Sequence, residues 1–208
     1  AILISVGEGL EADKARDKTA YINEQYEKYI VDSYAVDVQG NKVEGADAFT
    51  LLSDLKKVYE TPVEERQLPV FVSRSDDGTQ RYVLPLRGTG LWGPLWGYLA
   101  LDGDMSTIYG VVFDHQGETP GLGAEIATPP FQNQYKGKSI FKDGKLTGID
   151  VLKGVGSASG NSNAVDAIGG GTITSRGVEA MVKDNLAGYA AFIDRMKGAP
   201  APTQQEIE

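Results

Sequence analysis

The residues from 166 to 178 have the types and spacing best suited to hold an anionic ligand. Three consecutive glycines run into a cluster of hydroxyl side chains, and an apolar helical pattern follows at once; the residues are Gly169, Gly170, Gly171, Thr172, Thr174 and Ser175. Glycine lets a ligand approach the backbone closely, and a helix start offers unpaired N–H groups and the positive end of a dipole. Together these features can form an anion site, and the anion at such a site is most often a phosphate. A tight turn with a capping hydroxyl explains the same pattern without a ligand.

This glycine stretch differs from the common nucleotide-binding loops. No Lys precedes the hydroxyl residues in the frame that a Walker-type loop requires. No strand–helix–strand pattern surrounds the glycines, as a dinucleotide-binding fingerprint would need. The stretch therefore predicts either a phosphate site of another kind or a plain turn in front of the C-terminal helix.

Both tryptophans of the chain lie among glycines and prolines in residues 85–98. A tryptophan in a glycine-rich loop can form one wall of a site for a planar ligand. A tryptophan more often anchors a hydrophobic core, and that interpretation stays open here.

An irregular segment, residues 114–125, concentrates polar side chains where a strand is expected to end. Binding residues are often found on such loops. His115 and Glu118 could ligate a metal, but two ligands without a third are a weak signal. A hydrolase that uses Glu118 and Glu125 has no supporting spacing, and a structured turn is the plainer interpretation.

Composition narrows the chemistry further. The chain has 208 residues, a net charge of −9, one His and no Cys. The missing Cys excludes disulfides and thiolate catalysis, and a single His excludes most catalytic triads and multi-His metal sites. The negative charge argues against nucleic acid and against an anionic membrane surface as partners. Carboxylate chemistry, or the chemistry of a bound cofactor, remains.

The elements that must position these segments follow from hydrophobic periodicity. We expect helices over 10–30, 46–58 and about 123–135, hairpin turns at 39–41, 76–78, 102–104 and 142–145, and a flexible loop over 154–163. A final helix of about 20 residues should run from Val178 to Met196, with Ser175 as its N-cap. Repeated hairpins indicate an α+β fold with an antiparallel sheet, on which this long helix packs behind the glycine loop.

Three segments of the chain occur together, in this order, in the FMN-binding domain family. They are Gly90-Leu91-Trp92-Gly93, Glu118-Thr119-Pro120-Gly121-Leu122-Gly123 and Asp166 through Ser175. The sequence resembles this family loosely over about Pro69 to Met196. Within the family it is most similar to the C subunits of sodium-translocating NADH:quinone reductases, and more distantly to the G subunits of Rnf complexes.

The resemblance implies a covalent flavin. In the family the third motif reads Asp-x-x-Ser-Gly-Ala-Thr-x-Thr-Ser, and a flavin transferase joins its first Thr to the phosphate of FMN by a phosphodiester bond. That position falls on Thr172, while Gly169 and Gly171 replace the family's Ser and Ala. The residues implied to hold the phosphate are Asp166, Gly170, Gly171, Thr174, Ser175 and Lys153; those implied to line the flavin are Leu91, Trp92, Glu118, Thr119, Leu122 and Gly123.

The resemblance also implies an electron carrier in a membrane complex that couples NADH:quinone oxidoreduction to sodium translocation. Its partners would be the other subunits of that complex, and it would lie on the periplasmic side of a bacterial inner membrane. Residues 1–65 would then form a helical and hairpin segment behind a missing membrane anchor, 66–198 the FMN-binding domain, and 199–208 a disordered tail. An Rnf-type electron carrier, or a module that binds a phosphate ligand without redox chemistry, are the alternatives.

Overall fold

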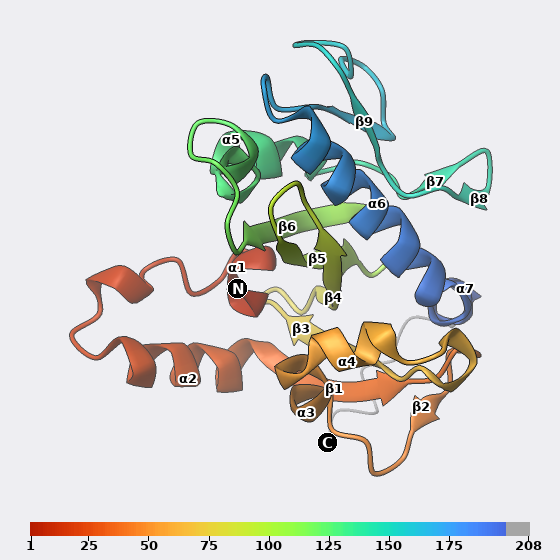
Figure 1. Ribbon diagram of the computed structural model, residues 1–208. Coiled ribbons are helices and arrows are strands. Elements are labelled where there is room, and N and C mark those ends of the chain that lie inside the picture. Colours follow the sequence, from red (N-terminus) through yellow and green to blue (C-terminus); the bar gives the residue numbers. More distant parts are fainter. Residues whose placement is uncertain (199–208) are drawn as a thin grey trace.

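A six-stranded antiparallel sheet forms the centre of the computed structural model, which describes residues 1–198 (Figure 1). Its strands are β1 (Ile30–Val36), β2 (Lys42–Val43), β3 (Leu68–Arg74), β4 (Gln80–Thr89), β5 (Pro94–Asp102) and β6 (Ile108–His115). The sheet order is β2-β1-β3-β4-β5-β6, so most neighbours are joined by hairpins. The expected α+β fold with an antiparallel sheet is confirmed, as are its first three hairpins.

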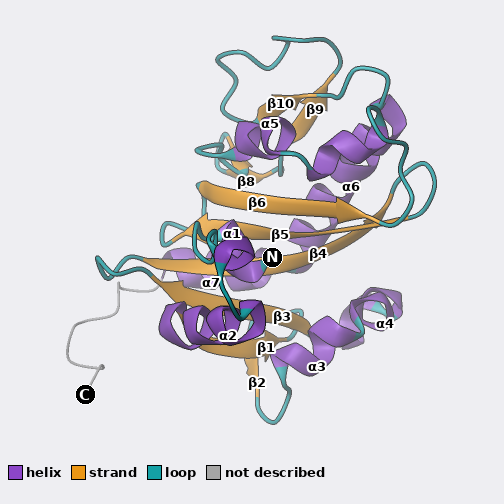
Figure 2. Cartoon of the chain, turned by 90° about the vertical axis from the view of Figure 1, so that its left-hand side faces the viewer, coloured by secondary structure: helices purple, strands orange, loops and turns teal. Residues whose placement is uncertain are grey.

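Helices pack on both faces of this sheet. They are α1 (Ile2–Ser5), α2 (Lys18–Tyr29), α3 (Ala48–Ser53), α4 (Leu55–Glu60), α5 (Pro129–Gln132), α6 (Thr172–Gly188) and α7 (Ala190–Gly198), with short 3-10 helices η1 (Ala12–Lys14), η2 (Val63–Glu65), η3 (Gly123–Ala127) and η4 (Asn133–Tyr135). Figure 2 shows α2, α3 and α4 near β1 and β2, and α5 beyond β6.

Alternating residues of the strands supply two hydrophobic clusters. Val70 and Val72 of β3 belong to the larger cluster, together with residues of α4, α6 and α7. Phe71, between them, belongs to the smaller cluster with residues of α1 and α3. Successive side chains of a strand point to opposite faces, so the two clusters lie on opposite sides of the sheet. The larger one attaches α6 to the sheet.

The C-terminal helical stretch begins earlier than expected and is broken. Helix α6 starts at Thr172 with Gly171 as its N-cap residue, and it ends at Gly188 before α7 begins. Ser175 lies inside the first turn and is fully buried, so its prediction as the N-cap was wrong. The apolar stripe starts only at Val178. The first turn is instead held by hydrogen bonds of the buried hydroxyls of Thr174 and Ser175, so hydrophobic periodicity could not reveal it.

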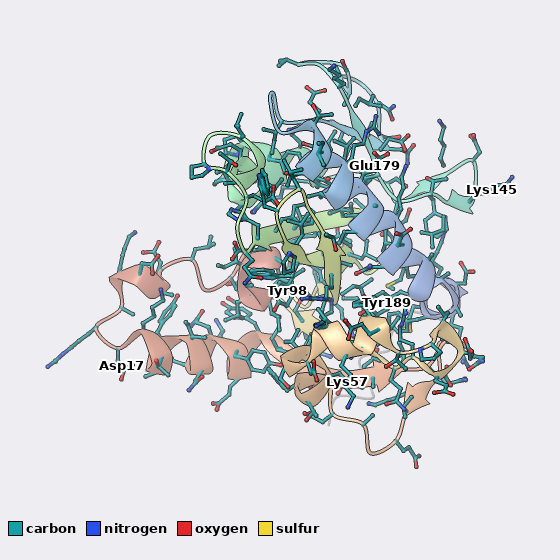
Figure 3. All side chains as sticks on the ribbon, viewed as in Figure 1. Asp17, Lys57, Tyr98, Lys145, Glu179 and Tyr189 are labelled. Carbon is teal, nitrogen blue, oxygen red and sulfur yellow. The ribbon has the colours of Figure 1, made fainter. Side chains whose placement is uncertain are left out.

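Tyr189 sits where α6 and α7 meet (Figure 3). Its hydroxyl is buried and donates to the carbonyl oxygen of Pro69 at 2.8 Å, and the carbonyl of Pro85 lies at 3.3 Å. The hydroxyl is thus satisfied by carbonyl groups of two neighbouring sheet strands. One buried phenol ties the helical junction to β3 and β4.

Several other elements differ from the expectation. The helix expected over 10–30 consists of η1 and α2, and the one expected over about 123–135 consists of η3, α5 and η4. The helix expected over 46–58 is split into α3 and α4 because Asp54 caps the second piece, accepting the N–H of Lys57 at 3.3 Å. The hairpin expected over 139–152 is reduced to β7 (Phe141–Lys142) and β8 (Lys145–Leu146). Strand β9 (Asp150–Leu152) pairs in parallel with β10 (Ala164–Asp166) instead. Local periodicity does not reveal which strand is the partner.

Three further points concern the expected domain boundary, the C-terminal tail and membrane-spanning helices. Strands β1 and β3 pair across the expected domain boundary between residues 65 and 66; that boundary stays a prediction. The expected tail, 199–208, lies outside the described residues. Within residues 1–198, no helix combines the length and apolar character needed to cross a membrane.

Candidate functional site

The three segments singled out from the sequence meet at the start of α6. Residues 90–93 form the turn between β4 and β5, and Glu118 lies on the loop that follows β6 (Figure 1). The N–H of Trp92 donates to Glu118 Oε1 at 2.8 Å, and the hydroxyl of Thr174 donates to Glu118 Oε2. Glu118 is only 5% exposed. One buried carboxylate therefore connects all three segments.

Glycines make these close contacts possible. A Cβ added to Gly90 would lie 2.5 Å from Glu118 Oε1, and one added to Gly123 would lie 2.6 Å from Glu118 Oε2. A Cβ on Gly177 would collide with the carbonyl oxygen of Thr89, so α6 approaches β4 closely at this end. Side chains at these positions would force the loops apart.

The loop after β6 also lies against the glycine stretch. Gly170 has a φ of +74°, and a Cβ there would be 2.5 Å from Leu122 Cδ2. A Cβ on Gly171 would lie 3.1 Å from the backbone of Leu122, whereas Gly169 has nothing within 4 Å. The carbonyl of Thr119 accepts N–H groups from Leu122 and Ala124 at 3.1 Å, which gives this loop its turn.

Thr172 is the first residue of α6 and is half-buried. No side chain within residues 1–198 caps this helix. The N–H groups of its first turn and the positive end of its dipole are therefore available to an anion. The arrangement satisfies the geometric requirement of a phosphate site at a helix start.

The hydroxyls of Thr174 and Ser175 are engaged inside the protein. Thr174 is 1% exposed and donates to Glu118, while Ser175 Oγ accepts the N–H of Ile168 at 3.0 Å. Both contacts hold the glycine loop against the body of the protein. The two residues therefore shape the site through hydrogen bonds of their own.

Asp166 holds the loop between β9 and β10. Its carboxylate accepts the N–H of Gly156 at 2.5 Å and that of Ala158 at 2.7 Å. Its own backbone N–H donates to Gln134 Oε1 at 2.7 Å. Lys153 is exposed on this loop, and its ammonium makes no hydrogen bond with residues 1–198. Turn hydrogen bonds thus order a segment that we expected to be flexible.

Large apolar side chains are exposed on all three segments. Leu91 is 46% exposed, Trp92 67%, Leu122 42% and Ile173 60%. Isolated exposed apolar residues are common, but here they come from loops that hydrogen bonds and close contacts bring together. A planar apolar ligand beside Thr172 would cover this surface.

An ion-pair network anchors the opposite side of α6 to β9. Lys183 Nζ lies 2.5 Å from Asp150 and 2.8 Å from Glu179, which Figure 3 shows on the helix. Burial acts to raise the pKa of Glu179, but hydrogen bonds from Lys183 and Arg176 outweigh it, so the pKa is lowered. The charged form of Glu179 is therefore favoured, and the network keeps the helix in place.

Sequence reasoning missed two residues that support the site. Asn185, 4% exposed, accepts the N–H of Arg87 at 2.6 Å and donates to its carbonyl at 3.1 Å. It lies seven residues after Val178, so a polar residue on the apolar stripe was its signal. Gln134, which brackets the backbone of Asp166, had no signal in the sequence.

Comparisons with known proteins agree with the three motifs. Residues 90–187 match the family model of the FMN-binding domain. A crystal structure of the C subunit of Na(+)-translocating NADH-quinone reductase from Parabacteroides distasonis is 39% identical, with a TM-score of 0.78, over 96% of this chain and 90% of that chain. Shewanella oneidensis NqrC is 26% identical, with a TM-score of 0.79, over 95% of both chains.

A curated relative points to the same family. The C subunit of the Na(+)-translocating NADH-quinone reductase of Chlamydia trachomatis is 39% identical over 136 residues, which cover 59% of this chain and 43% of the relative. The chain spans about half the length of the curated relatives it matches. The likeness to the Parabacteroides structure covers almost all of both chains. The chain therefore belongs to the family of the C subunits of Na(+)-translocating NADH-quinone reductases, and it carries their FMN-binding domain.

Proposed function

We propose that this chain is an electron carrier that holds one FMN through a phosphodiester bond to Thr172. The observation that supports this most strongly is the position of Thr172 as the first residue of α6, behind Gly170 and Gly171. The uncapped helix start would stabilise the phosphate, and the glycine backbone lets it approach. The match of residues 90–187 to the FMN-binding domain supports FMN as the source of that phosphate.

Attachment of FMN to Thr172 would be a phosphoryl transfer made by a separate flavin transferase. The bond between Thr172 Oγ1 and the phosphorus forms, and a phosphoanhydride bond of an activated FMN donor breaks. The hydroxyl proton is lost, and the leaving phosphate takes the electron pair. The product gains the mass of one FMN less one water. Among residues 1–198 no hydrogen bond occupies the Thr172 hydroxyl, so it is available to the transferase.

Different residues around Thr172 would contact the phosphate and the ring of the flavin. Gly170 and Gly171 would let the phosphate approach the backbone at the start of α6, and Lys153 would add positive charge. Asp166, Thr174 and Ser175 would act by holding the surrounding loops, because their side chains bond to protein atoms. The residues proposed to surround the ring are Leu91, Trp92, Glu118, Thr119, Leu122 and Gly123.

The redox chemistry in this proposal belongs to the bound flavin, which accepts electrons and passes them on. The residues of the chain bind and orient it, and the exposed apolar side chains of Leu91, Trp92 and Leu122 would shield one part of it from water. Tethering at the phosphate end leaves the ring end accessible. Such accessibility suits a carrier that exchanges electrons with protein partners.

We further propose the cellular setting from the names of the relatives. The carrier would act within a membrane complex that oxidises NADH, reduces quinone and translocates sodium, with the other subunits of that complex as partners. It would lie on the periplasmic side of a bacterial inner membrane, attached through an N-terminal anchor. In this setting the isolated chain binds neither NADH nor quinone.

Co-expression with a flavin transferase tests the attachment. After a denaturing gel, the protein should fluoresce as a flavoprotein. Thr172→Ala should abolish the fluorescence, while Thr172→Ser, which keeps a hydroxyl, should retain part of it. Asp184→Ala, which changes an exposed side chain farther along the same helix, should remain fluorescent and serves as the control. Flavin colour that is lost on denaturation would instead support a module that binds its phosphate ligand without a covalent bond.

A further inference from the structure

Glu118 is a buried carboxylate in a site where several large apolar side chains are exposed. It is 5% exposed, whereas Trp92, with which it bonds, is 67% exposed. Burying a carboxylate is costly unless hydrogen bonds replace its water. Glu118 has two such bonds, and they come from the β4–β5 turn and from the first turn of α6. Each oxygen accepts one donor, so neither oxygen of the buried carboxylate is left without a hydrogen bond.

The surroundings of this carboxylate are built to hold it. Gly90 and Gly123 lie on either side, and a Cβ at either position would come within 2.6 Å of a Glu118 oxygen. The backbone N–H of Glu118 donates to His115 Nδ1 at 3.2 Å, and this bond holds the main chain of the loop. The position of the carboxylate is therefore confined by the backbone of two loops as well as by its two hydrogen bonds.

The two donors to Glu118 belong to the two parts of the site that must be aligned. Trp92 is the large exposed aromatic residue of the β4–β5 turn, and its backbone N–H is one donor. Thr174 lies two residues after Thr172 in the same helical turn, and its hydroxyl is the other. A shift of either segment would break a charge-assisted hydrogen bond in a buried place.

We propose that Glu118 is the positioning residue of this site. By accepting hydrogen bonds from Trp92 and Thr174, it fixes the Trp92 loop relative to Thr172 before a flavin is attached. Its fixed negative charge then disfavours the addition of electrons to a neighbouring flavin, so the flavin's midpoint potential is lower than it would be beside a neutral residue. The first part concerns the protein alone, and the second rests on the proposed function.

The protein without flavin tests the first part. Amide hydrogen exchange of the full chain should show faster exchange at Trp92, by about tenfold or more, in Glu118→Ala, since that amide loses a charged acceptor. Glu118→Gln keeps a carbonyl acceptor and should restore most of the protection. Glu125→Gln is the matched control, because Glu125 bonds to Gly121 and not to Trp92, and its exchange at Trp92 should equal the wild type.

The flavin-loaded protein tests the second part. Loading should be slower in Glu118→Ala, and Glu118→Gln should recover a large share of it. The midpoint potential of the flavin in Glu118→Gln should be more positive than in the wild type and in Glu125→Gln. A purely structural role for Glu118 would leave this potential where it is in the control.

Two results would overturn the proposal. One is unchanged exchange at Trp92 in Glu118→Ala. The other is a midpoint potential in Glu118→Gln equal to that of the wild type. If Glu118→Ala does not fold, Thr174→Val provides the alternative: it removes one donor, and faster exchange at the amides of the first turn of α6 is then the expected result. Failure of the wild type to load would contradict the proposed function, while the exchange measurements would still test the positioning.

Discussion

At the residue scale, the three glycines before Thr172 have different surroundings. Gly170 has a left-handed backbone and touches Leu122, Gly171 lies tightly against the backbone of the same residue, and Gly169 faces open space. The family's Ser-Gly-Ala pattern keeps glycine only at the position of Gly170. The conformation explains that, because a side chain with a positive φ is strained and the contact leaves no room for it.

Gly170→Ala should therefore destabilise the protein by about 1–2 kcal/mol and slow flavin attachment, since the backbone at the acceptor must rearrange. Gly169→Ser adds the side chain that the family carries and should change stability by less than about 0.5 kcal/mol. Urea unfolding and the rate of flavin loading measure both effects. Equal stability of the two variants would show that the glycine loop is not held in this conformation.

Asp166 provides a second prediction at this scale. Asp166→Ala leaves the N–H groups of Gly156 and Ala158 without their acceptor and should cost about 1–3 kcal/mol. Amide exchange at these two residues should accelerate. In Asp166→Asn, which keeps one acceptor oxygen, the exchange rates should lie between those of the wild type and of Asp166→Ala. Unchanged exchange at both amides would contradict a role for Asp166 in holding this loop.

At the scale of elements, α6 carries Thr172 and is fixed to the sheet along its length. Asn185 bonds to both backbone groups of Arg87 on β4, and Gly177 lets the helix approach the end of that strand. Lys183 connects the other side of the helix to β9. The position of the acceptor residue therefore depends on contacts far along the helix.

Asn185→Ala should lower the free energy of unfolding by about 1–3 kcal/mol, because it leaves backbone groups of Arg87 without partners. Asp184→Ala, one residue away on the exposed face of the same helix, is the control and should have little effect. Thermal unfolding of the two variants distinguishes them. A loss in Asp184→Ala as large as in Asn185→Ala would contradict the assignment of the loss to the contact with β4.

The sequence predicted the sheet and three of its hairpins because turn residues and alternating strands are local signals. It also identified the three motifs, which the hydrogen bonds of Glu118 bring together. It missed the first turn of α6, whose buried hydroxyls have no apolar periodicity. It missed the parallel pairing of β9 with β10 as well, since strand partners depend on contacts between distant residues. The hydrogen bond from Thr174 to Glu118 could not be predicted from the sequence, because it joins residues that only the fold brings together.

At the scale of the whole molecule, carboxylates in turns and at helix starts give the stability a dependence on pH. Hydrogen bonds from the Ser75 hydroxyl and from the N–H of Thr79 lower the pKa of Asp77 from 3.8 to about 2. The pKa values of Asp37 and Asp47 are lowered too, chiefly by hydrogen bonds from Asn41 and Thr50. The unfolded chain therefore binds protons first as the pH falls, and acid destabilises the fold.

Because the folded pKa of Asp77 lies below the unfolded value, its contribution to stability is present above pH 3.8 and is lost as the pH falls through about 2. Asp77→Asn should thus be less stable than the wild type at pH 6, and the difference should shrink between pH 4 and pH 2. Urea unfolding at several pH values measures this. A difference that stays constant with pH would contradict the assignment.

The central claim, a flavin held on Thr172, is tested most directly by the mass of the denatured chain after loading with a flavin transferase. The wild type should gain the mass of one FMN less one water, and peptide mapping should locate the gain on the fragment that contains Thr172. Thr172→Ala should show no gain, while Thr174→Val should keep one on the same fragment. An unmodified wild type, or an equal gain in Thr172→Ala, would contradict the account.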